Sequence, residues 1–290
     1  MINIKSSVLL NERLTQNCWH MVLEATLIAS EAKPGQFINV KIGKTNDPLF
    51  RRPFNIFKCV NLNGSALGIE IVYGLVGRGT RVMADLRHGD ELDIIGPLGH
   101  GFEWSLDKKV HVLLGGGIGS AALFMLGEQI SKVVEEYGVE LNILLGAKTR
   151  EELVLEREFK RLNGRVLVST DDGTYGYHGF VTEMLTDNIN SGKISPQCKI
   201  YGCGPKPMLK ALALICLQYG IPAQVSVERH MMCGIGACLS CVCKVNKNTP
   251  LRLRDPKSSQ IQFIPEEKFG YALVCKDGPV FYMDELIFDE

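Results

Sequence analysis

The sequence lacks an excess of charge of either sign. Its 290 residues contain 32 Lys and Arg against 32 Asp and Glu, so the formal net charge is zero. A chain without a global positive field is not expected to bind nucleic acid or an anionic membrane surface. Any phosphate group that it binds must therefore be held by a few local groups. Internal repeats and low-complexity tracts are also lacking, so the organisation is read from changes in hydrophobic period.

A secretory leader is lacking too. The first thirty residues show no basic start, apolar run and small-residue cleavage site in succession, so a cytoplasmic protein is expected. One run of 18 residues, 110–127, carries no Asp, Glu, Lys or Arg and approaches membrane-spanning length. Glycines in its middle divide it into a short strand, a turn and a helix start, which argues against a membrane span.

The first part of the chain reads as β structure. Apolar residues alternate with polar ones, Asn39 among them, over residues 38–42, which is the period of a half-buried strand. The same period recurs over 67–73, and Asn63-Gly64 between two apolar runs is typical of a hairpin. The sequence predicts an antiparallel β-barrel over residues 1–104, with an ordinary β-sandwich as the alternative.

From Lys109 onward, strands alternate with helices. Strands are expected at 110–114, 141–145, 166–169 and 199–201, and helices from about Ser120 and over 207–219. This alternation predicts a Rossmann-like α/β domain over 105–226, with a mostly parallel sheet covered by helices. The remainder, 227–290, holds five of the ten cysteines and is predicted to be a small metal-stapled subdomain.

The most specific motif is made of cysteines. Cys233, Cys238 and Cys241 have the spacing C-x4-C-x2-C, and Cys275 follows 34 positions later, which is the plant-type [2Fe-2S] arrangement. The alternatives are a zinc site, which the x4 gap fits less well, and reduced buried thiols. Cys243 competes with Cys241 as the third ligand; the x2 spacing favours Cys241, and a spare buried thiol is the alternative for Cys243.

A second motif is glycine-rich and follows a predicted strand. Gly117, Gly119 and Ala122 match G-x-G-x-x-A, which places a pyrophosphate at a helix start and indicates dinucleotide binding. The turn at Gly202-Cys203-Gly204-Pro205 also ends a strand and opens a helix, although a lone Cys203 is more often a packed core thiol.

The residues after the second α/β strand bear on nucleotide choice. No carboxylate ends that strand, and Lys148 and Arg150 permit a 2′-phosphate on charge grounds. Glu151 and Glu152 follow immediately and would repel such a phosphate, so NAD is expected rather than NADP.

Taken together, these residues resemble the ferredoxin reductase superfamily, and within it the electron transfer subunits of NAD-dependent (type B) dihydroorotate dehydrogenases. The resemblance covers essentially the whole chain, and the cysteine motif is its most specific part. It implies a multidomain protein with a flavin-binding β-barrel, a Rossmann-like nucleotide domain and a C-terminal [2Fe-2S] subdomain. FAD and the cluster are the implied cofactors, and NAD is the implied substrate.

The resemblance also implies site residues. The stretch from Arg52 to Asn55 is similar to the family's flavin motif, Arg-x-Tyr-Ser, whose arginine holds the FAD phosphates while the next residues line the isoalloxazine. The implied FAD contacts are Arg52, Pro53, Phe54, Asn55, Val72, Tyr73, Gly74, Gly79 and Thr80. The implied NAD contacts are Gly115, Gly116, Gly117, Gly119, Cys203 and Gly204, and the implied cluster ligands are Cys233, Cys238, Cys241 and Cys275.

Two positions depart from the family's pattern. Asn55 stands where the family has Ser or Thr, so an amide would take the place of the hydroxyl beside flavin N5. The span between Cys241 and Cys275 is longer than expected for this subunit, and residues 245–271 are interpreted as an inserted loop that could remodel the surface facing a partner.

The cofactor set predicts the chemistry. A nicotinamide exchanges hydride whereas an iron–sulfur cluster carries single electrons, so a flavin has to stand between them, and no catalytic acid–base side chain is expected. The resemblance implies an FMN-containing catalytic subunit that oxidises dihydroorotate to orotate in pyrimidine biosynthesis, in a heterotetramer of two of each subunit. Two alternatives stay open: the small subunit of an NAD(P)H:ferredoxin or sulfide dehydrogenase type complex, and a redox carrier without catalysis.

Overall fold

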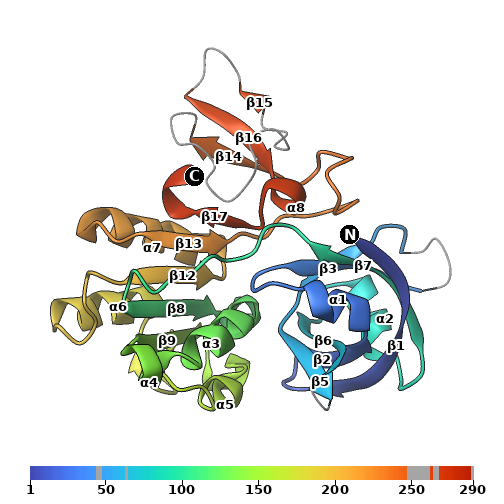
Figure 1. Cartoon of the computed structure of the whole chain (residues 1–290), viewed down its shortest axis with the longest axis horizontal. Helices are drawn as coiled ribbons and strands as arrows, with labels where there is room; N and C mark the ends of the chain where they lie inside the picture. The colour runs from blue at the N-terminus through green and yellow to red at the C-terminus, as the bar shows by residue number, and fades with distance from the viewer. Residues whose placement is uncertain (44–47, 63–64, 247–261, 264–267, 289–290) are drawn as a thin grey trace.

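The computed structural model describes residues 1–43, 48–62, 65–246, 262–263 and 268–288. The chain runs from a β-barrel, through an α/β domain, to a small subdomain that carries the cysteine motif (Figure 1). No helix in these described ranges is long and apolar enough to cross a membrane. The uncharged run 110–127 forms a strand, a 3-10 helix and the start of an α-helix.

The barrel is one curled antiparallel sheet with the strand order β4-β3-β7-β1-β2-β6-β5. Its strands are β1 (Ile2–Arg13), β2 (Cys18–Glu24), β3 (Phe37–Lys41), β4 (Arg52–Asn55), β5 (Lys58–Leu62), β6 (Ser65–Gly74) and β7 (Glu91–Leu98). Two short helices, α1 (Thr26–Glu31) and α2 (Arg78–Ala84), lie in the connections. The predicted hairpin is present as paired β5 and β6, while Asn63-Gly64 lies outside the described residues.

Alternating residues of β3 and β6 build the barrel core. Ile38, Val40 and Ile69 are fully buried, as the period of two predicts. Asn39 does not follow this pattern, because it is also fully buried on the opposite face of β3. The half-buried prediction is therefore wrong at this residue, since the loop that begins at Cys233 covers the outer face of the strand there.

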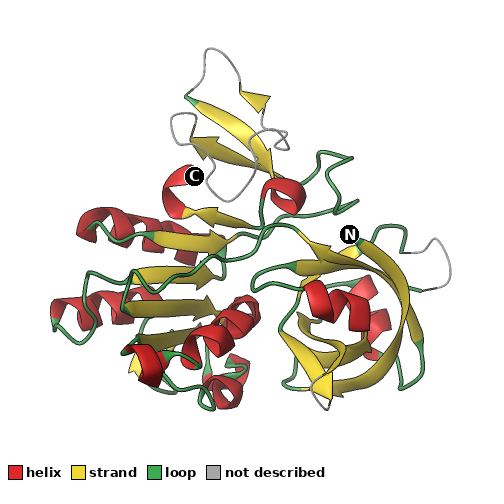
Figure 2. Ribbon diagram, in the orientation of Figure 1, coloured by secondary structure: helices red, strands yellow, loops and turns green. Residues whose placement is uncertain are grey.

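The second sheet has the order β11-β10-β9-β8-β12-β13-β17 and is parallel except at β17. Helices cover both of its faces (Figure 2). Its parallel strands are β8 (Val110–Gly116), β9 (Glu140–Ala147), β10 (Arg165–Thr170), β11 (Tyr177–His178), β12 (Lys199–Cys203) and β13 (Ala223–Ser226). The order reverses between β8 and β12, which is where α/β sheets of this kind bind ligands.

The helices of this domain follow the predicted alternation, with one local difference. They are η1 (Gly117–Leu123), α3 (Phe124–Ser131), α4 (Val134–Tyr137), η2 (Arg150–Glu152), α5 (Glu156–Phe159), α6 (Val181–Asn190) and α7 (Lys206–Tyr219). The α-helix expected from about Ser120 begins at Phe124, because the glycine-rich residues before it form the 3-10 helix η1.

The C-terminal segment folds partly on its own and partly onto the second sheet. A three-stranded sheet, β14-β16-β15, contains β14 (Val242–Asn246), β15 (Gln262–Phe263) and β16 (Phe269–Leu273). After α8 (Val274–Asp277), β17 (Val280–Tyr282) pairs with β13 and η3 (Met283–Glu285) follows. The ends of the supposed inserted loop 245–271 are thus strand, while most of it lies outside the described residues. The boundaries at 104 and 226 stay a prediction.

Candidate functional site

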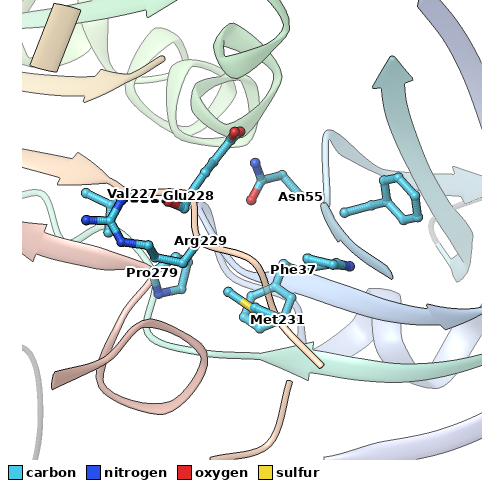
Figure 3. A pocket seen from close by; sticks show the side chains of 9 residues that line it. Phe37, Asn55, Val227, Glu228, Arg229, Met231 and Pro279 are labelled. Atoms are coloured by element: carbon cyan, nitrogen blue, oxygen red, sulfur yellow. Dashed lines mark hydrogen bonds between the residues drawn. The ribbon is translucent and has the colours of Figure 1, made fainter. Parts of the chain in front are cut away.

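A cavity of about 170 Å³ lies where the barrel, the segment after β13 and Pro279 meet (Figure 3). It is smaller than a typical pocket for a whole cofactor, which holds about 300–1,000 Å³, so it suits one edge of a ring system. Its walls combine apolar and polar side chains from three segments: Phe37, Pro53, Phe54, Asn55, Val227, Glu228, Arg229, Met231 and Pro279. Three residues of the predicted flavin motif are among them.

Asn55 and Glu228 point into this cavity from opposite sides (Figure 3). Glu228 is the second residue after β13, and desolvation by the surrounding protein raises the pKa of its carboxyl. The sequence analysis missed Glu228, because a single acidic residue beside an arginine normally reads as solvated surface. Its position two residues after a strand at the edge of the α/β domain was the only available signal.

Arg52 of the flavin motif and the preceding Arg51 have different environments. Arg51 forms an ion pair with Asp93 at 2.5 Å and also donates to the Asp93 carbonyl at 2.8 Å, so its charge is used within the barrel. Arg52 donates to the Phe50 carbonyl and lies against Gly79, where an added Cβ would be 3.2 Å from the arginine Nε. The structure therefore brings Arg52 and the start of α2 together.

The remaining predicted flavin residues are largely internal. Tyr73 is buried in the barrel core and donates to Asn11 Oδ1 at 2.9 Å, and Val72 is buried on the opposite face. Thr80 Oγ1 accepts the backbone N–H of Val76 at 3.0 Å, so this hydroxyl caps α2. Gly74 lies beside Ile118 of η1. Any FAD contact by Tyr73 or Thr80 in this conformation would have to come from the backbone.

The glycine turns after β8 and β12 pack against each other. A Cβ on Gly119 would lie 2.8 Å from Gly204 Cα, and one on Gly204 would lie 3.0 Å from Gly116 Cα. Gly117 has φ +54°, in the left-handed region that glycine adopts without strain. Gly115 also has no room for a side chain, because its Cβ would meet Ser120 at 2.6 Å. Close contact with neighbouring atoms explains why Gly115, Gly119 and Gly204 lack a side chain, and the positive φ explains Gly117.

Gly119→Ala is expected to destabilise the fold by about 1–3 kcal/mol, because the added methyl overpacks the contact with Gly204. The measurement is the free energy of unfolding from denaturant titration. Gly77→Ala is the matched control, since Gly77 has extended backbone and no atom within 4 Å of an added Cβ. Equal stabilities of the two variants would contradict this packing role.

A larger cavity, of about 450 Å³, lies at the carboxyl ends of β8, β9 and β10. The glycine turn and the start of α7 form one side, and charged residues after β9 and β10 form the other. Lys148, Glu152 and Asp171 line it, and desolvation raises the pKa of the Asp171 carboxyl. Arg150 instead places its guanidinium over the ring of Tyr175, 5.0 Å from the centroid.

Carboxylates therefore line the cavity although none ends β9. Asp171 is the first residue after β10, and its N–H donates to the Ala147 carbonyl at 3.0 Å, which fixes it beside the end of β9. The sequence analysis missed Asp171 because it looked for the acidic residue on the second strand rather than on the third. Cys203, in contrast, is fully buried, desolvation raises the pKa of its thiol, and it does not line this cavity.

The four predicted ligand thiols lie as two pairs. Cys233 Sγ accepts the N–H of Cys238 at 3.4 Å and interacts with its thiol, and Cys241 Sγ accepts the N–H of Cys275 at 3.4 Å while the two thiols contact each other. Hydrogen bonding to Ser240 lowers the pKa of Cys238 to about 6, and contact with Cys275 lowers that of Cys241 to about 7. The lowered pKa of Cys238 favours its thiolate, the form that binds metal, whereas the contact that lowers the pKa of Cys241 raises that of Cys275.

Backbone N–H groups also converge on these sulfur atoms. Gly236 donates to Cys275 Sγ at 3.1 Å and Ile235 donates to Cys233 Sγ at 3.5 Å, and Gly234 and Gly236 have φ of +72° and +84°, which glycine adopts without strain. Among the residues that the structure describes, no three His, Cys, Asp or Glu side chains are placed to hold one metal ion. Two thiol pairs surrounded by N–H donors fit a two-iron cluster, whose irons each take two thiolates.

Cys243 lies away from these pairs. It is a buried residue of β14 opposite Ala272, and it lines a separate cavity of about 210 Å³ with Gly204 and Leu286. The geometry thus favours Cys241 over Cys243 as the third ligand.

Two family models match parts of the chain. Residues 228–254 match the family model for the iron-sulfur cluster binding domain of dihydroorotate dehydrogenase B. Residues 113–213 match the model for the oxidoreductase NAD-binding domain.

Relatives match nearly the whole chain. The dihydroorotate dehydrogenase B (NAD(+)) electron transfer subunit of Fusobacterium nucleatum is 36% identical, with 95% of each chain covered. That of Geobacillus thermodenitrificans is 33% identical, with 98% of each chain covered. The chain belongs to this family of electron transfer subunits. The expected resemblance is confirmed.

Solved structures agree with the fold of these electron transfer subunits. An NADH-dependent reduced ferredoxin-NADP oxidoreductase superposes with a TM-score of 0.76 at 23% identity, covering 98% of this chain and 90% of its own. A ferredoxin NADP+ reductase from Neisseria gonorrhoeae with bound FAD and NADP gives a TM-score of 0.58 at 18% identity, covering 75% and 92%. The fold is therefore that of the ferredoxin reductases.

Proposed function

We propose that this chain passes electrons from an FMN-containing catalytic subunit, which oxidises dihydroorotate to orotate, through a [2Fe-2S] cluster and FAD to NAD+. The observation that carries the proposal is the position of residues 227–231. Val227, Glu228, Arg229 and Met231 line the cavity of the flavin motif, and the chain reaches Cys233 two residues later. Val227, Glu228 and Arg229 also line the adjoining cavity that contains Gly204. One short segment thus runs from the flavin cavity to the first cysteine of the motif and passes beside Gly204 of the second glycine turn.

The residues present fit FAD, NAD and a [2Fe-2S] cluster. Arg52 would hold the FAD phosphates beside Gly79, and β4 spans roughly 10 Å from Arg52 to Asn55, which would carry the flavin ring to the cavity in Figure 3. The turns at Gly117 and Gly204 would hold NAD, and Cys233, Cys238, Cys241 and Cys275 would ligate the cluster. When bound, a flavin exchanges hydride with the nicotinamide and single electrons with the cluster. Phe54 and Pro53 exclude water from its edge, and the Asn55 amide offers a hydrogen bond there.

The test is anaerobic rapid mixing of the purified holoprotein with NADH. Flavin reduction followed by an EPR signal from the reduced cluster is the expected order. A cluster that is reduced before the flavin, or a flavin that NADH does not reduce, would contradict the proposal. The second result would instead favour a carrier without catalysis, the alternative that the intact glycine turns argue against.

The partner is proposed to dock on residues 232–241, called the cluster loop below, in a heterotetramer of two of each subunit. Cys238 is exposed, and Met232, Ile235 and Leu239 around it are 46%, 44% and 51% exposed. Large apolar side chains exposed on one loop are typical of a protein interface. The name of the family implies such a catalytic partner. The other candidate partners are those of a ferredoxin or sulfide dehydrogenase type complex, and the flavin and substrate of the copurifying subunit distinguish them.

Ile235→Glu is expected to weaken binding of the catalytic subunit at least tenfold, because it places a charge in an apolar contact. The matched control is Leu217→Glu, where the leucine is 82% exposed on α7, a helix of the α/β domain. The measurement is the dissociation constant of the complex, with cluster content checked in both variants. Equal weakening by the two substitutions would move the interface away from the cluster loop.

NADH is expected to be preferred over NADPH by more than tenfold in kcat/KM with an artificial acceptor. Glu152 and Asp171 face the cavity as carboxylates, and Arg150 is held over Tyr175, so Lys148 is the remaining cation at the rim. Asp171→Asn should reduce the preference, whereas Asp172→Asn should not, because the Asp172 carboxylate is bonded to Thr174. A tenfold preference for NADPH, about 1.4 kcal/mol, would overturn the assignment.

We also place the protein in the cytoplasm. None of the ten cysteines, all of which the structure describes, forms a disulfide, which suits a reducing compartment.

A further inference from the structure

Asn39 is a polar residue in the middle of a buried strand. It lies in β3 and is 0% exposed, although the alternation of β3 would place it on the solvent side. Burying an amide is unfavourable unless it is hydrogen-bonded, so an apolar residue would be the simpler choice here. The packing of the barrel core does not explain why an amide is buried at this position, so a hydrogen-bond partner outside the barrel is sought.

The Asn39 side chain binds the cluster loop. Its Nδ2 donates to the Cys233 carbonyl at 2.8 Å, across 194 residues of sequence. The amide orientation follows from its partner, since a carbonyl can only accept. Gly234 fits directly above, with φ +72°, and an added Cβ there would collide with the Asn39 amide. Asn39 Oδ1 has no hydrogen-bond partner in the described structure. The bond from Nδ2 to the Cys233 carbonyl is therefore the one hydrogen bond that the described structure gives for this side chain.

The same strand forms one wall of the flavin cavity. Phe37, two residues earlier in β3, lines that cavity, and Asn39 itself pairs in register with Pro53, which lines it too. Two residues of strand span roughly 7 Å. Asn39 therefore links the flavin cavity to the first predicted cluster ligand. The backbone of β3 connects it to Phe37, and one hydrogen bond connects it to Cys233.

We propose that Asn39 is a positioning residue that holds the Cys233 loop at a fixed place relative to the flavin cavity. Through this bond it sets how fast electrons pass between the flavin and the cluster. The proposal rests on the proposed function, since it requires both groups to be bound. It assigns no chemistry to the Asn39 side chain itself, which touches neither reacting atom in the structure.

The test uses Asn39→Leu, which matches the size of the side chain but cannot donate to the Cys233 carbonyl. In the holoprotein, NADH should reduce the flavin within about twofold of the wild-type rate. The following reduction of the cluster should be slower by up to about tenfold, because losing one hydrogen bond lowers the equilibrium constant for the held position of the loop by about that factor. Amide hydrogen exchange of residues 233–238 should be faster by a similar factor, and this readout needs no turnover.

Asn142→Leu is the matched control. Asn142 is also a fully buried strand asparagine with an unpartnered Oδ1, but it lies in β9 and donates to Glu140. It should leave both cluster reduction and exchange at 233–238 unchanged. Unchanged loop exchange and unchanged cluster reduction in Asn39→Leu would overturn the inference. Failure of NADH to reduce the wild-type flavin would overturn the proposed function instead, so the two failures are distinguishable.

Discussion

Replacing Cys241 by serine is expected to remove the [2Fe-2S] cluster, whereas replacing Cys243 is expected to leave it in place. Cys241 contacts Cys275 and accepts its backbone N–H, while Cys243 is a strand residue of β14 that lines a different cavity. Loss of one of four thiolates leaves an iron with an incomplete ligand set. The expected effect is loss of the cluster from the purified protein rather than a graded change.

Iron and acid-labile sulfide content after anaerobic purification, together with the EPR spectrum of the reduced protein, measure this effect. Cys216→Ser serves as a second control, because Cys216 is a buried thiol of α7 that the cluster does not require. A cluster retained in Cys241→Ser and lost in Cys243→Ser would move the ligand by two residues. Stoichiometric zinc without sulfide in the wild-type protein would contradict the cluster itself.

Replacing Arg52 by alanine is expected to release FAD while keeping the cluster. A charge-assisted bond to phosphate is worth about 1.5–3 kcal/mol, so the affinity for FAD should fall about ten- to a hundredfold. Arg52 is the arginine of the pair that stays beside Gly79, since Arg51 is held by Asp93. FAD per polypeptide and iron per polypeptide, measured on the same sample, separate the two effects.

Arg13→Ala is the matched control, because it removes the same charge from the same barrel at a site where Arg13 bonds only to backbone carbonyls of its own turn, among the contacts that the structure gives. Full FAD occupancy in Arg52→Ala would contradict the phosphate-binding role. Equal loss of FAD in both variants would indicate that net charge, rather than a specific contact, is responsible.

Local patterns in the sequence predicted most of the architecture. The alternation over 38–42 and 67–73 identified β3 and β6, and the glycine turn located the point where the order of the second sheet reverses. These signals are local, because the period of a strand and the shape of a turn depend on neighbouring residues. The return of β17 to the second sheet was not predicted, since its pairing with β13 spans more than fifty residues.

The candidate site was only partly predictable for the same reason. Cysteine spacing predicted four ligands, because loop length limits which thiols can meet around a cluster. Glu228, Asp171 and Asn39 carry little local signal beyond their positions in or just after a strand. Each becomes informative only when another segment lies against it: β4 opposite Glu228, β9 beside Asp171, and the Cys233 loop over Asn39. A polar residue in an alternating strand is ordinarily a solvent-facing one, which is why the period gave the wrong environment for Asn39.

Dihydroorotate-driven reduction of NAD+ tests the central claim most directly, because it requires the whole path from partner to nucleotide. The assay uses the complex that copurifies with this chain, compared with the same catalytic subunit alone and with a complex that contains Cys241→Ser. NADH formation by the intact complex only, with loss of at least a hundredfold in both comparisons, is the expected result. NADH formed at the same rate without this chain, or through a chain that lacks the cluster, would contradict the account.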